Sequence, residues 1–381
     1  MKMLSIGPIE GNITVFRSKF EQAVAKWEGP AKLAVLYLPF TAEHEKFLEV
    51  VGRALKCPVV GATTGGVAFT ERGHSQTGAV CAVLGGDDFE ADCSVAVNVR
   101  SNPVFHIGHA LKAMDLKRGR HTAVLVLADA FACDGEALVS AVRDHVPPHC
   151  KFFGGTAGDD WGFKGSKVFL DGKSMSNAAV FVAMHPQQRL NVDVLHGWCM
   201  ADGSREFTIT SMDGNVLRKL DDRPAVDVYA EELRRLGLLS DSENLISVLA
   251  KYELGARTPF GEQLKIRAPL SIGTDGSITL ASSLRQGEVV RVVTTTSERL
   301  IDAARNLSTR VLGPSPRAAG SLVFDCAARL QLLGDRYGEE VRAFQGGGSH
   351  PMVGMACYGE IAKFGGSIEG FHNTTAVMVG W

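Results

Sequence analysis

The chain has 381 residues, of which 45% are hydrophobic and 22% are charged, and its formal net charge is −2 at pH 7. This length exceeds what one hydrophobic core normally supports, so we expect two domains or two intimate halves. The Lys and Arg residues are scattered along the sequence, which indicates neither a nucleic-acid partner nor an anionic membrane surface.

Targeting signals are missing from the sequence pattern. Residues 1–6 lack the apolar core of a secretory signal, and no apolar run approaches the roughly 18 residues that cross a bilayer. We therefore expect a cytoplasmic protein with no membrane partner. The cysteines form no C-x-x-C pair and most lie in apolar segments, so we expect neither a disulfide framework nor structural zinc.

The first half of the chain alternates helix and strand. Apolar periodicity predicts a helix, a strand, a helix and a strand, in that order, at 14–27, 32–38, 42–55 and 57–66. The same order returns at 102–114, 122–128, 135–146 and 150–160. The glycine turns 61–65 and 154–158 occupy equivalent places, which indicates an internal duplication. Since each sheet face must be covered, the unit predicts mixed sheets with helices packed over them.

The second half begins near Gly197 with a predicted hairpin, 205–220, whose turn is Asp213-Gly214. The further predicted elements are a helix, a strand pair, a helix, a strand and a helix, at 225–237, 270–280, 297–312, 320–326 and 335–345. Residues 354–360, followed by 373–381, are a looser third version of the duplicated unit. The fold class is therefore α/β, with an internally duplicated domain over 1–196 and a second α/β domain over 197–381.

Several segments in this order resemble the FIST family of sensory domains. They are "VVGATTGG", "FFGGTAGDD" and "KVFLDGKSMSNAAVFVAM" in the first half, and "GNVLRKLDDRPAVDVY", "SLVFDCAARLQLLG", "CYGEIA" and "FHNTTAV" in the second. The resemblance implies a cytoplasmic ligand-binding sensor in signal transduction, without established catalysis. A narrower resemblance is to the nitric-oxide-sensing haemoproteins called NosP, which bind haem through a histidine and regulate a histidine kinase. With no output module in the chain, such a sensor would signal through a separate partner.

His350 lies between the glycines 346–348 and Pro351. Neutral imidazole suits haem iron whose other face stays open to a gas, and the proline holds its neighbour in extended geometry. The resemblance thus implies haem b, with His350 as the metal ligand. The side chains expected around the macrocycle are those of Pro351, Met352, Met355, Cys357 and Tyr358. Two alternatives stay open: His350 is incidental to a surface loop, or Cys357 is a rival ligand rather than an inert buried thiol.

A second group of polar residues is expected at the mouth of a pocket near the glycine turns. It consists of Thr63, Thr64, Thr156, Asp159, Asp160, Glu360, His372 and Asn373. Hydroxyls, carboxylates and an amide suit a small polar ligand such as an amino acid. Catalytic signatures such as G-x-S-x-G and H-E-x-x-H are missing, and adjacent Asp159 and Asp160 would point apart, so we expect no enzyme.

The sequence therefore yields two hypotheses. The first is a haem-binding sensor of nitric oxide, or of another diatomic gas, that regulates a partner histidine kinase. The alternative is a haem-free sensor of a small polar metabolite. The oligomeric state is not fixed by the sequence, and a homodimer is among the states left open.

Overall fold

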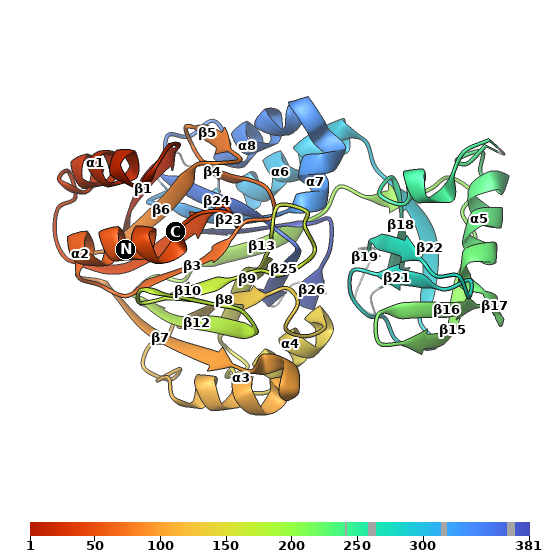
Figure 1. Ribbon diagram of the computed structural model, residues 1–381, viewed down its shortest axis with the longest axis horizontal. Coiled ribbons are helices and arrows are strands. Elements are labelled where there is room, and N and C mark those ends of the chain that lie inside the picture. The colour runs from red at the N-terminus through yellow and green to blue at the C-terminus, as the bar shows by residue number, and fades with distance from the viewer. Residues whose placement is uncertain (241, 258–263, 314–317, 364–369) are drawn as a thin grey trace.

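The computed structural model describes residues 1–240, 242–257, 264–313, 318–363 and 370–381. The chain forms a large body and a smaller lobe beside it, and both termini lie in the body (Figure 1). We call the lobe, residues 199–294, the insert, because the chain leaves the body near Gly197 and returns to it at Ser297. No helix in the described ranges is both long and apolar enough to span a membrane.

The body contains three six-stranded sheets. The first has the order β1 (Lys2–Ile9), β6 (Ala79–Gly85), β2 (Ala31–Leu38), β3 (Val59–Thr63), β10 (Val168–Leu170) and β11 (Lys173–Met175). The second has the order β7 (Phe89–Val97), β12 (Ala178–Pro186), β8 (Ala123–Asp129), β9 (Lys151–Ala157), β25 (Gly359–Lys363) and β26 (Gly370–His372). The third has the order β13 (Asn191–Leu195), β27 (Ala376–Gly380), β23 (Ser321–Cys326), β24 (Met352–Cys357), β4 (Ala68–Thr70) and β5 (Gly73–Ser75).

All three sheets follow one plan. Each has a central pair of parallel strands, which are β2 and β3 in the first sheet, β8 and β9 in the second, and β23 and β24 in the third. On one side of this pair lie two antiparallel strands from the same repeat of the duplicated unit. On the other side lies a hairpin donated by a different repeat. The first repeat donates β4–β5 to the third sheet, the second donates β10–β11 to the first, and the third donates β25–β26 to the second. The predicted duplication is confirmed, and the looser C-terminal copy is a full third repeat.

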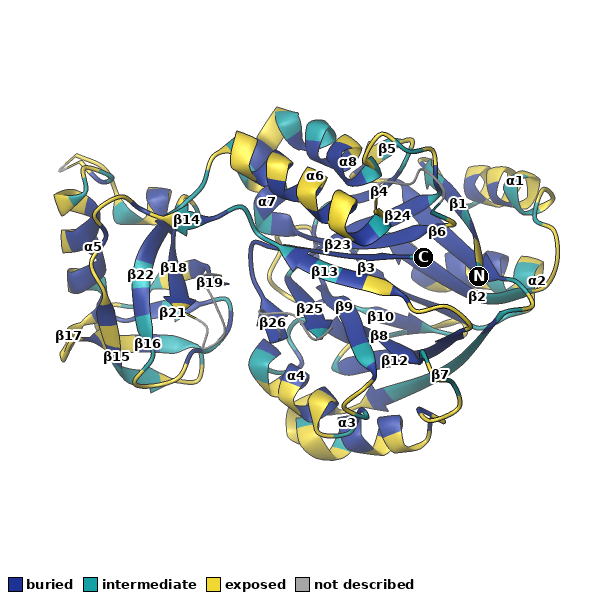
Figure 2. Ribbon diagram, turned by 180° about the vertical axis from the view of Figure 1, so that it is seen from behind, coloured by how far each residue is buried: buried dark blue, intermediate teal, exposed yellow. Residues whose placement is uncertain are grey.

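Helices cover the outer faces of the sheets, as expected (Figures 1 and 2). α1 (Ile13–Val24) and α2 (His44–Leu55) pack on the first sheet, and α3 (Pro103–Lys112) and α4 (Gly135–Arg143) on the second. The third is covered by α6 (Ser297–Leu312), α7 (Ala327–Leu333) and α8 (Tyr337–Gln345). The inner faces meet in one core shared by all three sheets, which includes Leu33, Leu125 and Phe324. Strands buried on both faces read as continuous apolar runs, which is why they are recognisable in the sequence.

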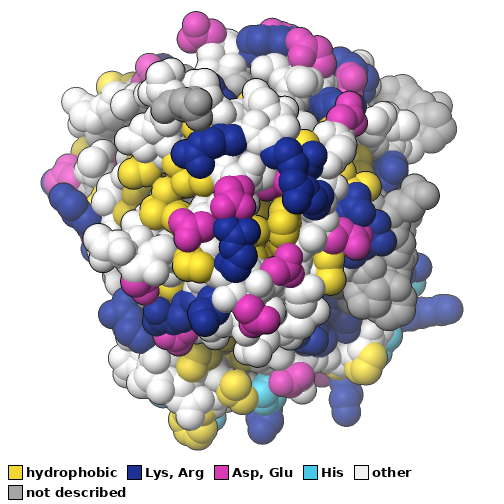
Figure 3. Space-filling model, turned by 90° about the vertical axis from the view of Figure 1, so that its right-hand side faces the viewer, with side chains coloured by type: hydrophobic (Ala, Val, Ile, Leu, Met, Phe, Trp, Pro, Cys, Tyr) yellow, Lys and Arg dark blue, Asp and Glu magenta, His cyan; other side chains and the backbone are white. Residues whose placement is uncertain are grey.

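The insert is built on a nine-stranded sheet with its own core. Its main path is β19 (Leu264–Arg267), β18 (Tyr252–Arg257), β22 (Val289–Thr294), β15 (Phe207–Asp213), β16 (Val216–Leu220), β21 (Ile278–Leu280) and β20 (Pro269–Ile272). The side strands are β14 (Cys199–Met200) and β17 (Arg223–Pro224), and α5 (Ala225–Arg235) packs against the sheet. The hairpin predicted at 205–220 is confirmed by β15 and β16. Basic, acidic and apolar side chains are mixed on the outer end of the insert (Figure 3).

The predicted division into 1–196 and 197–381 describes sequence segments and stays a prediction. In space, the third sheet joins β13 and β4 from the first segment to β23, β24 and β27 from the second. Because the three inner faces share one core, residues 297–381 complete the body. The insert is the part that stands apart.

The three repeats meet where β3, β9 and β24 end. Gly65 N–H donates to the Ala356 carbonyl at 2.7 Å, Gly158 N–H to that of Thr63 at 3.0 Å, and Tyr358 N–H to that of Thr156 at 3.1 Å. The three bonds form a closed ring in which each repeat donates to another. Two of the donors are glycines because the turns approach closely, and a Cβ on Gly158 would lie 2.5 Å from Gly65 Cα. The third donor is Tyr358, which breaks the symmetry of the ring.

Candidate functional site

A cavity of about 320 Å³ lies on the Tyr358 side of this ring, between the body and the insert. Its volume is within the range of small-molecule sites. Aromatic rings form much of its wall: Phe131, Trp161, Phe163, Tyr358 and Phe371. Small residues of α4, α7 and the insert, including Gly135, Ala327, Ala268 and Ala281, leave the space open. We call it the central cavity.

Tyr358 organises one side of the central cavity. Its hydroxyl donates to Asp159 Oδ1 at 2.7 Å and accepts from the Trp161 N–H at 2.7 Å, and its ring stacks on Phe163 with centroids 5.2 Å apart. Asp159 also accepts hydrogen bonds from the amides of residues 163, 164 and 165. Burial alone would raise the pKa of Asp159, but these donors hold it below its ordinary value. Asp159 is therefore a fixed carboxylate that shapes the loop 159–165.

Four of the ten described non-glycine residues with positive φ lie around this cavity. Asp160, Trp161 and Phe163 have φ of +54°, +67° and +50°, and Thr374 has φ of +51°. Positive φ is uncommon for residues other than glycine, and it is a genuine outlier for a β-branched residue such as threonine. Strain of this kind gathers at ligand-binding sites because the surrounding structure must hold it in place. Three of these four residues, Trp161, Phe163 and Thr374, line the central cavity.

Asn373 is the unpaired polar group of the central cavity. Its side chain lines the cavity and the residue is only 1% exposed, yet neither Oδ1 nor Nδ2 has a hydrogen-bond partner among the described residues. Buried polar atoms are nearly always paired, because leaving one unpaired costs about 1–3 kcal/mol. A carboxamide provides both an acceptor and a donor. Asn373 is thus ready to bind a ligand that carries both.

Glu360 lies behind the cavity wall. Its Oε1 accepts from Cys357 Sγ at 3.3 Å and its Oε2 from the Thr375 N–H at 3.2 Å. Burial raises the pKa of Glu360 to about 8, so the carboxyl is largely protonated at neutral pH. Burial also raises the pKa of the Cys357 thiol well above its ordinary value. Cys357 is therefore an inert thiol, which disfavours its alternative role as an iron ligand.

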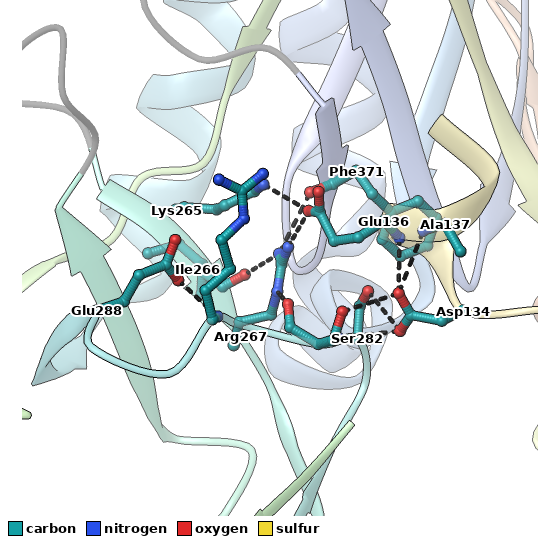
Figure 4. Close-up of polar contacts among 11 residues, drawn as sticks. Asp134, Glu136, Ala137, Lys265, Ile266, Arg267, Ser282, Glu288 and Phe371 are labelled. Atoms are coloured by element: carbon teal, nitrogen blue, oxygen red, sulfur yellow. Dashed lines mark hydrogen bonds and ion pairs between the residues drawn. The ribbon is translucent and has the colours of Figure 1, made fainter. Parts of the chain in front are cut away.

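The insert is fastened to the body beside the central cavity by five residues, which we call the polar clamp: Asp134, Glu136, Arg267, Ser282 and Ser283. Asp134 caps α4 by accepting from the Glu136 N–H at 2.9 Å (Figure 4). It also accepts from Ser282 Oγ at 3.0 Å, Ser283 N–H at 3.0 Å and Ser283 Oγ at 2.9 Å.

Arg267 completes the clamp from the insert side. It is fully buried, pairs with Glu136, and donates to the carbonyls of Phe371 at 3.2 Å and Ser283 at 3.1 Å (Figure 4). Lys265 Nζ also lies against the Glu136 carboxylate. A buried guanidinium that serves an acid and two carbonyls fixes orientation as well as contact. The insert wall of the cavity is thereby held in register with α4 and β26.

His350 lies elsewhere, at the start of β24. It is 5% exposed, and its Nε2 is 3.1 Å from Ser321 Oγ. His350 does not line the central cavity. It also does not line the described cavities beside residues 72–77 or the cavity beside residues 120–123 and 148–151. Gly61, Gly154 and Gly354 are equivalent residues of β3, β9 and β24. His350 lies four residues before Gly354, just as Cys57 and Cys150 lie four residues before their own glycines, so the three residues hold equivalent positions in the three repeats. Burial lowers its pKa, so the ring is neutral.

The residues around His350 do not fit a haem as the structure places them. Met352, Met355 and Cys357 are fully buried within the sheets, and Pro351 is half-buried beside them. Nothing there opens a face of the imidazole to a flat macrocycle. Within the described residues, no group of three or more His, Cys, Asp or Glu side chains is arranged to hold a metal ion. Haem binding through His350 stays a prediction without support from this geometry.

The structure separates the predicted pocket residues into three groups. Thr156 and Asn373 line the central cavity, together with Cys357 and Tyr358, which were expected around the haem, while Asp159 and Glu360 lie behind its wall. The others lie outside the lining: Thr63 Oγ1 donates to the Gly158 carbonyl at 2.6 Å, Thr64 and Asp160 belong to the surrounding turns, and His372 is the last residue of β26.

Sequence reasoning missed the rest of the aromatic wall and the whole polar clamp. Trp161 and Phe163 follow directly after the predicted glycine turn at 154–158, and two aromatic residues in a turn were an available signal. Nothing in the sequence pattern joins Asp134 to Arg267, because they are 133 residues apart and meet only through the placement of the insert.

A partly open cavity with aromatic walls and an unpaired buried amide is typical of a ligand-binding protein. Comparison with family models agrees with this class: the FIST N domain model matches residues 32–223 and the FIST C domain model matches residues 225–363. The chain therefore belongs to the FIST family, and its role is sensory, in signal transduction. A search of curated proteins finds no match.

Proposed function

We propose that this protein is a haem-free sensor that binds a small polar metabolite, such as an amino acid, in the central cavity. The observation that carries the proposal is Asn373, whose buried carboxamide has no partner of its own. Aromatic rings around it would receive the apolar part of the ligand. Family membership supports a sensory role, and the geometry supports the place of binding.

The chemistry of the lining narrows the ligand class. Asp134 is the acidic residue in the wall, and its oxygens are already occupied by α4 and the insert. The free groups are therefore neutral: the amide of Asn373 and the hydroxyl of Thr156, which has a long 3.4 Å bond to the Gly359 carbonyl. A carboxylate or carboxamide on an apolar or aromatic molecule would match this lining.

Ligand binding can be reported through the insert. Asn215, Ala268, Leu270 and Ala281 bring the insert into the cavity wall, opposite residues of the body. A ligand that contacts both sides binds one placement of the insert better than another, and that difference shifts the population between them. The surface of the insert would then change for a separate partner. A histidine kinase as that partner is the expectation from the resemblance.

The test is a thermal-shift screen of the full chain against the amino acids, with hits confirmed by calorimetry. A ligand that binds only the folded state raises the melting temperature. Asn373→Ala is expected to weaken binding about tenfold or more, because a buried hydrogen-bonding group is lost. Asn306→Ala, on the exposed face of α6, is the matched control and should bind as the parent does. Equal affinity of Asn373→Ala and the parent for every hit would rule out this site.

Haem b, nitric oxide and regulation of a histidine kinase remain predictions from the narrower resemblance. They require protein from haem-supplied cells to show a Soret band that His350→Ala removes. The buried, hydrogen-bonded state of His350 leads us to expect no such dependence. A Soret band lost in that variant would place haem ahead of the metabolite.

A further inference from the structure

A second hollow lies at the opposite end of β8 and β9, where these strands begin. Its volume is about 460 Å³, and none of its eleven lining residues is acidic. Four of them are lysines or arginines and two are histidines: Arg120, Lys151, Arg189, Lys363, His121 and His149. We call it the basic hollow.

The cations of the basic hollow lack counterions. No ion pair engages Arg120, Lys151, Arg189 or Lys363 within the described residues. Lys151 Nζ donates to the Leu190 carbonyl at 2.8 Å, and Lys363 Nζ to that of Pro148 at 3.2 Å, which leaves further N–H donors on both ammonium groups. Arg218 on the insert provides a contrast, because its guanidinium pairs with Asp213 at 2.9 Å.

Lys151 is half-buried and lies near the like charge of Arg189. Burial, together with the nearby Arg189 guanidinium, lowers the pKa of Lys151 to about 8. Asp193 acts in the opposite direction, but its carboxylate is already 3.5 Å from Arg310. The half-buried ammonium is therefore held close to like charge without full compensation. A bound anion would relieve this repulsion.

Comparison among the three repeats shows that the basic character is specific to the second one. The first residues of β3 and β24, Val59 and Met352, each donate their N–H to a carboxylate of the paired hairpin: to Asp171 Oδ1 and to Glu71 Oε2, both at 3.0 Å. In the second repeat, the residue opposite the equivalent Phe152 is Lys363. A lysine thus replaces an acid.

The neighbouring position changes in the same way. Pro58 and Pro351 precede the first residues of their strands, and each carbonyl accepts from the adjacent parallel strand, at 2.9 Å from Ala34 N and 3.0 Å from Ser321 N. The second repeat has Lys151 there, paired with Ala123. Two lysines therefore stand where the common architecture uses a proline and an acid. Each lysine makes one hydrogen bond to a backbone carbonyl, and Lys363 Nζ lies over the Phe152 ring, but neither position requires a cation in the other two repeats.

We propose that the basic hollow binds a compact phosphate-bearing small molecule with two or more negative charges, separately from the ligand of the central cavity. Arg and Lys donors converging on a hollow without acids match phosphate oxygens. The hollow is lined by imidazoles, aliphatic groups and charged stems, and it lacks the Phe, Tyr and Trp rings on which successive bases of a nucleic-acid strand would stack. A small phosphate compound therefore fits better than a nucleic acid.

Calorimetric titration of the full chain with pyrophosphate tests the proposal. Binding is expected at low salt and should weaken as salt rises, because these charges are partly exposed. Lys151→Gln and Arg189→Gln should each weaken binding about tenfold, since each removes a charge-assisted donor. Lys363→Glu, which gives this repeat the acidic character of the other two, should weaken it most. Arg17→Gln, an exposed cation of α1 outside the hollow, is the matched control.

Three results would overturn the proposal. The first is no heat of binding with pyrophosphate at low salt. The second is binding that neither Arg189→Gln nor Lys151→Gln weakens; Arg189 is exposed, so this variant should fold normally, as its melting temperature will show. The third is tighter binding of citrate or of a single-stranded oligonucleotide than of pyrophosphate, which would indicate a carboxylate site or a nucleic-acid surface. Binding of pyrophosphate is independent of Asn373, so the two proposed sites can fail separately.

Discussion

The Glu360 carboxyl is completely buried behind the central cavity, and its nearest partners are a thiol and a backbone amide. A carboxyl whose pKa is higher in the folded protein than in the unfolded chain holds its proton more tightly when folded. It therefore stabilises the fold at low pH, fully below the unfolded value near 4.5, and this stabilisation is lost as the pH rises towards the folded value of about 8.

Glu360→Gln should remove this dependence. The parent is expected to lose stability relative to the variant as the pH rises from about 4.5 to 8, with a slope of at most about 1.4 kcal/mol per pH unit for one proton. Denaturant unfolding of both proteins across this range measures the difference. The Glu360 charge also contributes to raising the pKa of the buried Glu253 carboxyl, after burial itself, so the difference between the two proteins includes this contribution. Parallel stability curves for parent and variant would contradict a raised pKa for Glu360.

Single residues were predictable where they sit beside the duplicated glycine turns. Thr156, Tyr358 and Asn373 line the central cavity because these turns converge there. His350 was predicted to be a haem ligand because a histidine between glycine and proline resembles a ligand on a rigid segment. The three repeats give a simpler reason for the proline, since Pro58 holds the same place in the first repeat.

At the scale of elements, the ring formed by Gly65, Gly158 and Tyr358 is the junction of the three sheets. Helices and strands of the body were predictable because buried strands and amphipathic helices leave clear apolar periods. The exchange of hairpins was not predictable, since β4, β10 and β25 are short and nothing in three to five residues specifies which sheet they join.

Gly158→Ala should destabilise this junction. The new Cβ would meet the Gly65 backbone at 2.5 Å, and backbone on both sides cannot move without breaking the ring. We expect a loss of about 1–3 kcal/mol in the free energy of unfolding, as for overpacked sites. Gly165→Ala, where a Cβ meets nothing within 4 Å and φ is not positive, is the control and should change stability little. Equal melting temperatures for the two variants would show that the ring tolerates movement.

At the scale of the whole molecule, the insert supplies one wall of the central cavity. The sequence placed a second α/β unit after Gly197, but no local pattern shows that residues 297–381 return to complete the body. Long-range pairing of β23, β24 and β27 with strands from the first 200 residues depends on burial of the shared core, which is a property of the assembled sheets. The same placement brings Ser282 and Ser283 against the N-terminus of α4.

Asp134→Ser tests whether the polar clamp holds the insert for binding. Serine also caps helices well, so α4 should persist, but the shorter side chain cannot reach Ser282 and Ser283. We expect faster amide hydrogen exchange in β20 and β21 of the insert, because the loss of hydrogen bonds to a charged group, worth about 1.5–3 kcal/mol each, lowers the energy of opening. Affinity for the central-cavity ligand should fall with it, while pyrophosphate binding stays unchanged.

Asp302→Ser, on the exposed face of α6, is the control for this experiment. If exchange in the insert rises but ligand affinity holds, the insert is no part of the binding surface, and the signal must leave through the body. If neither changes, the Asp134 contacts are redundant with those of Arg267, whose buried guanidinium still joins the insert to Glu136 and to the Phe371 carbonyl. Only a joint change in exchange and affinity fits an insert whose placement reports the ligand, because one equilibrium would then govern both.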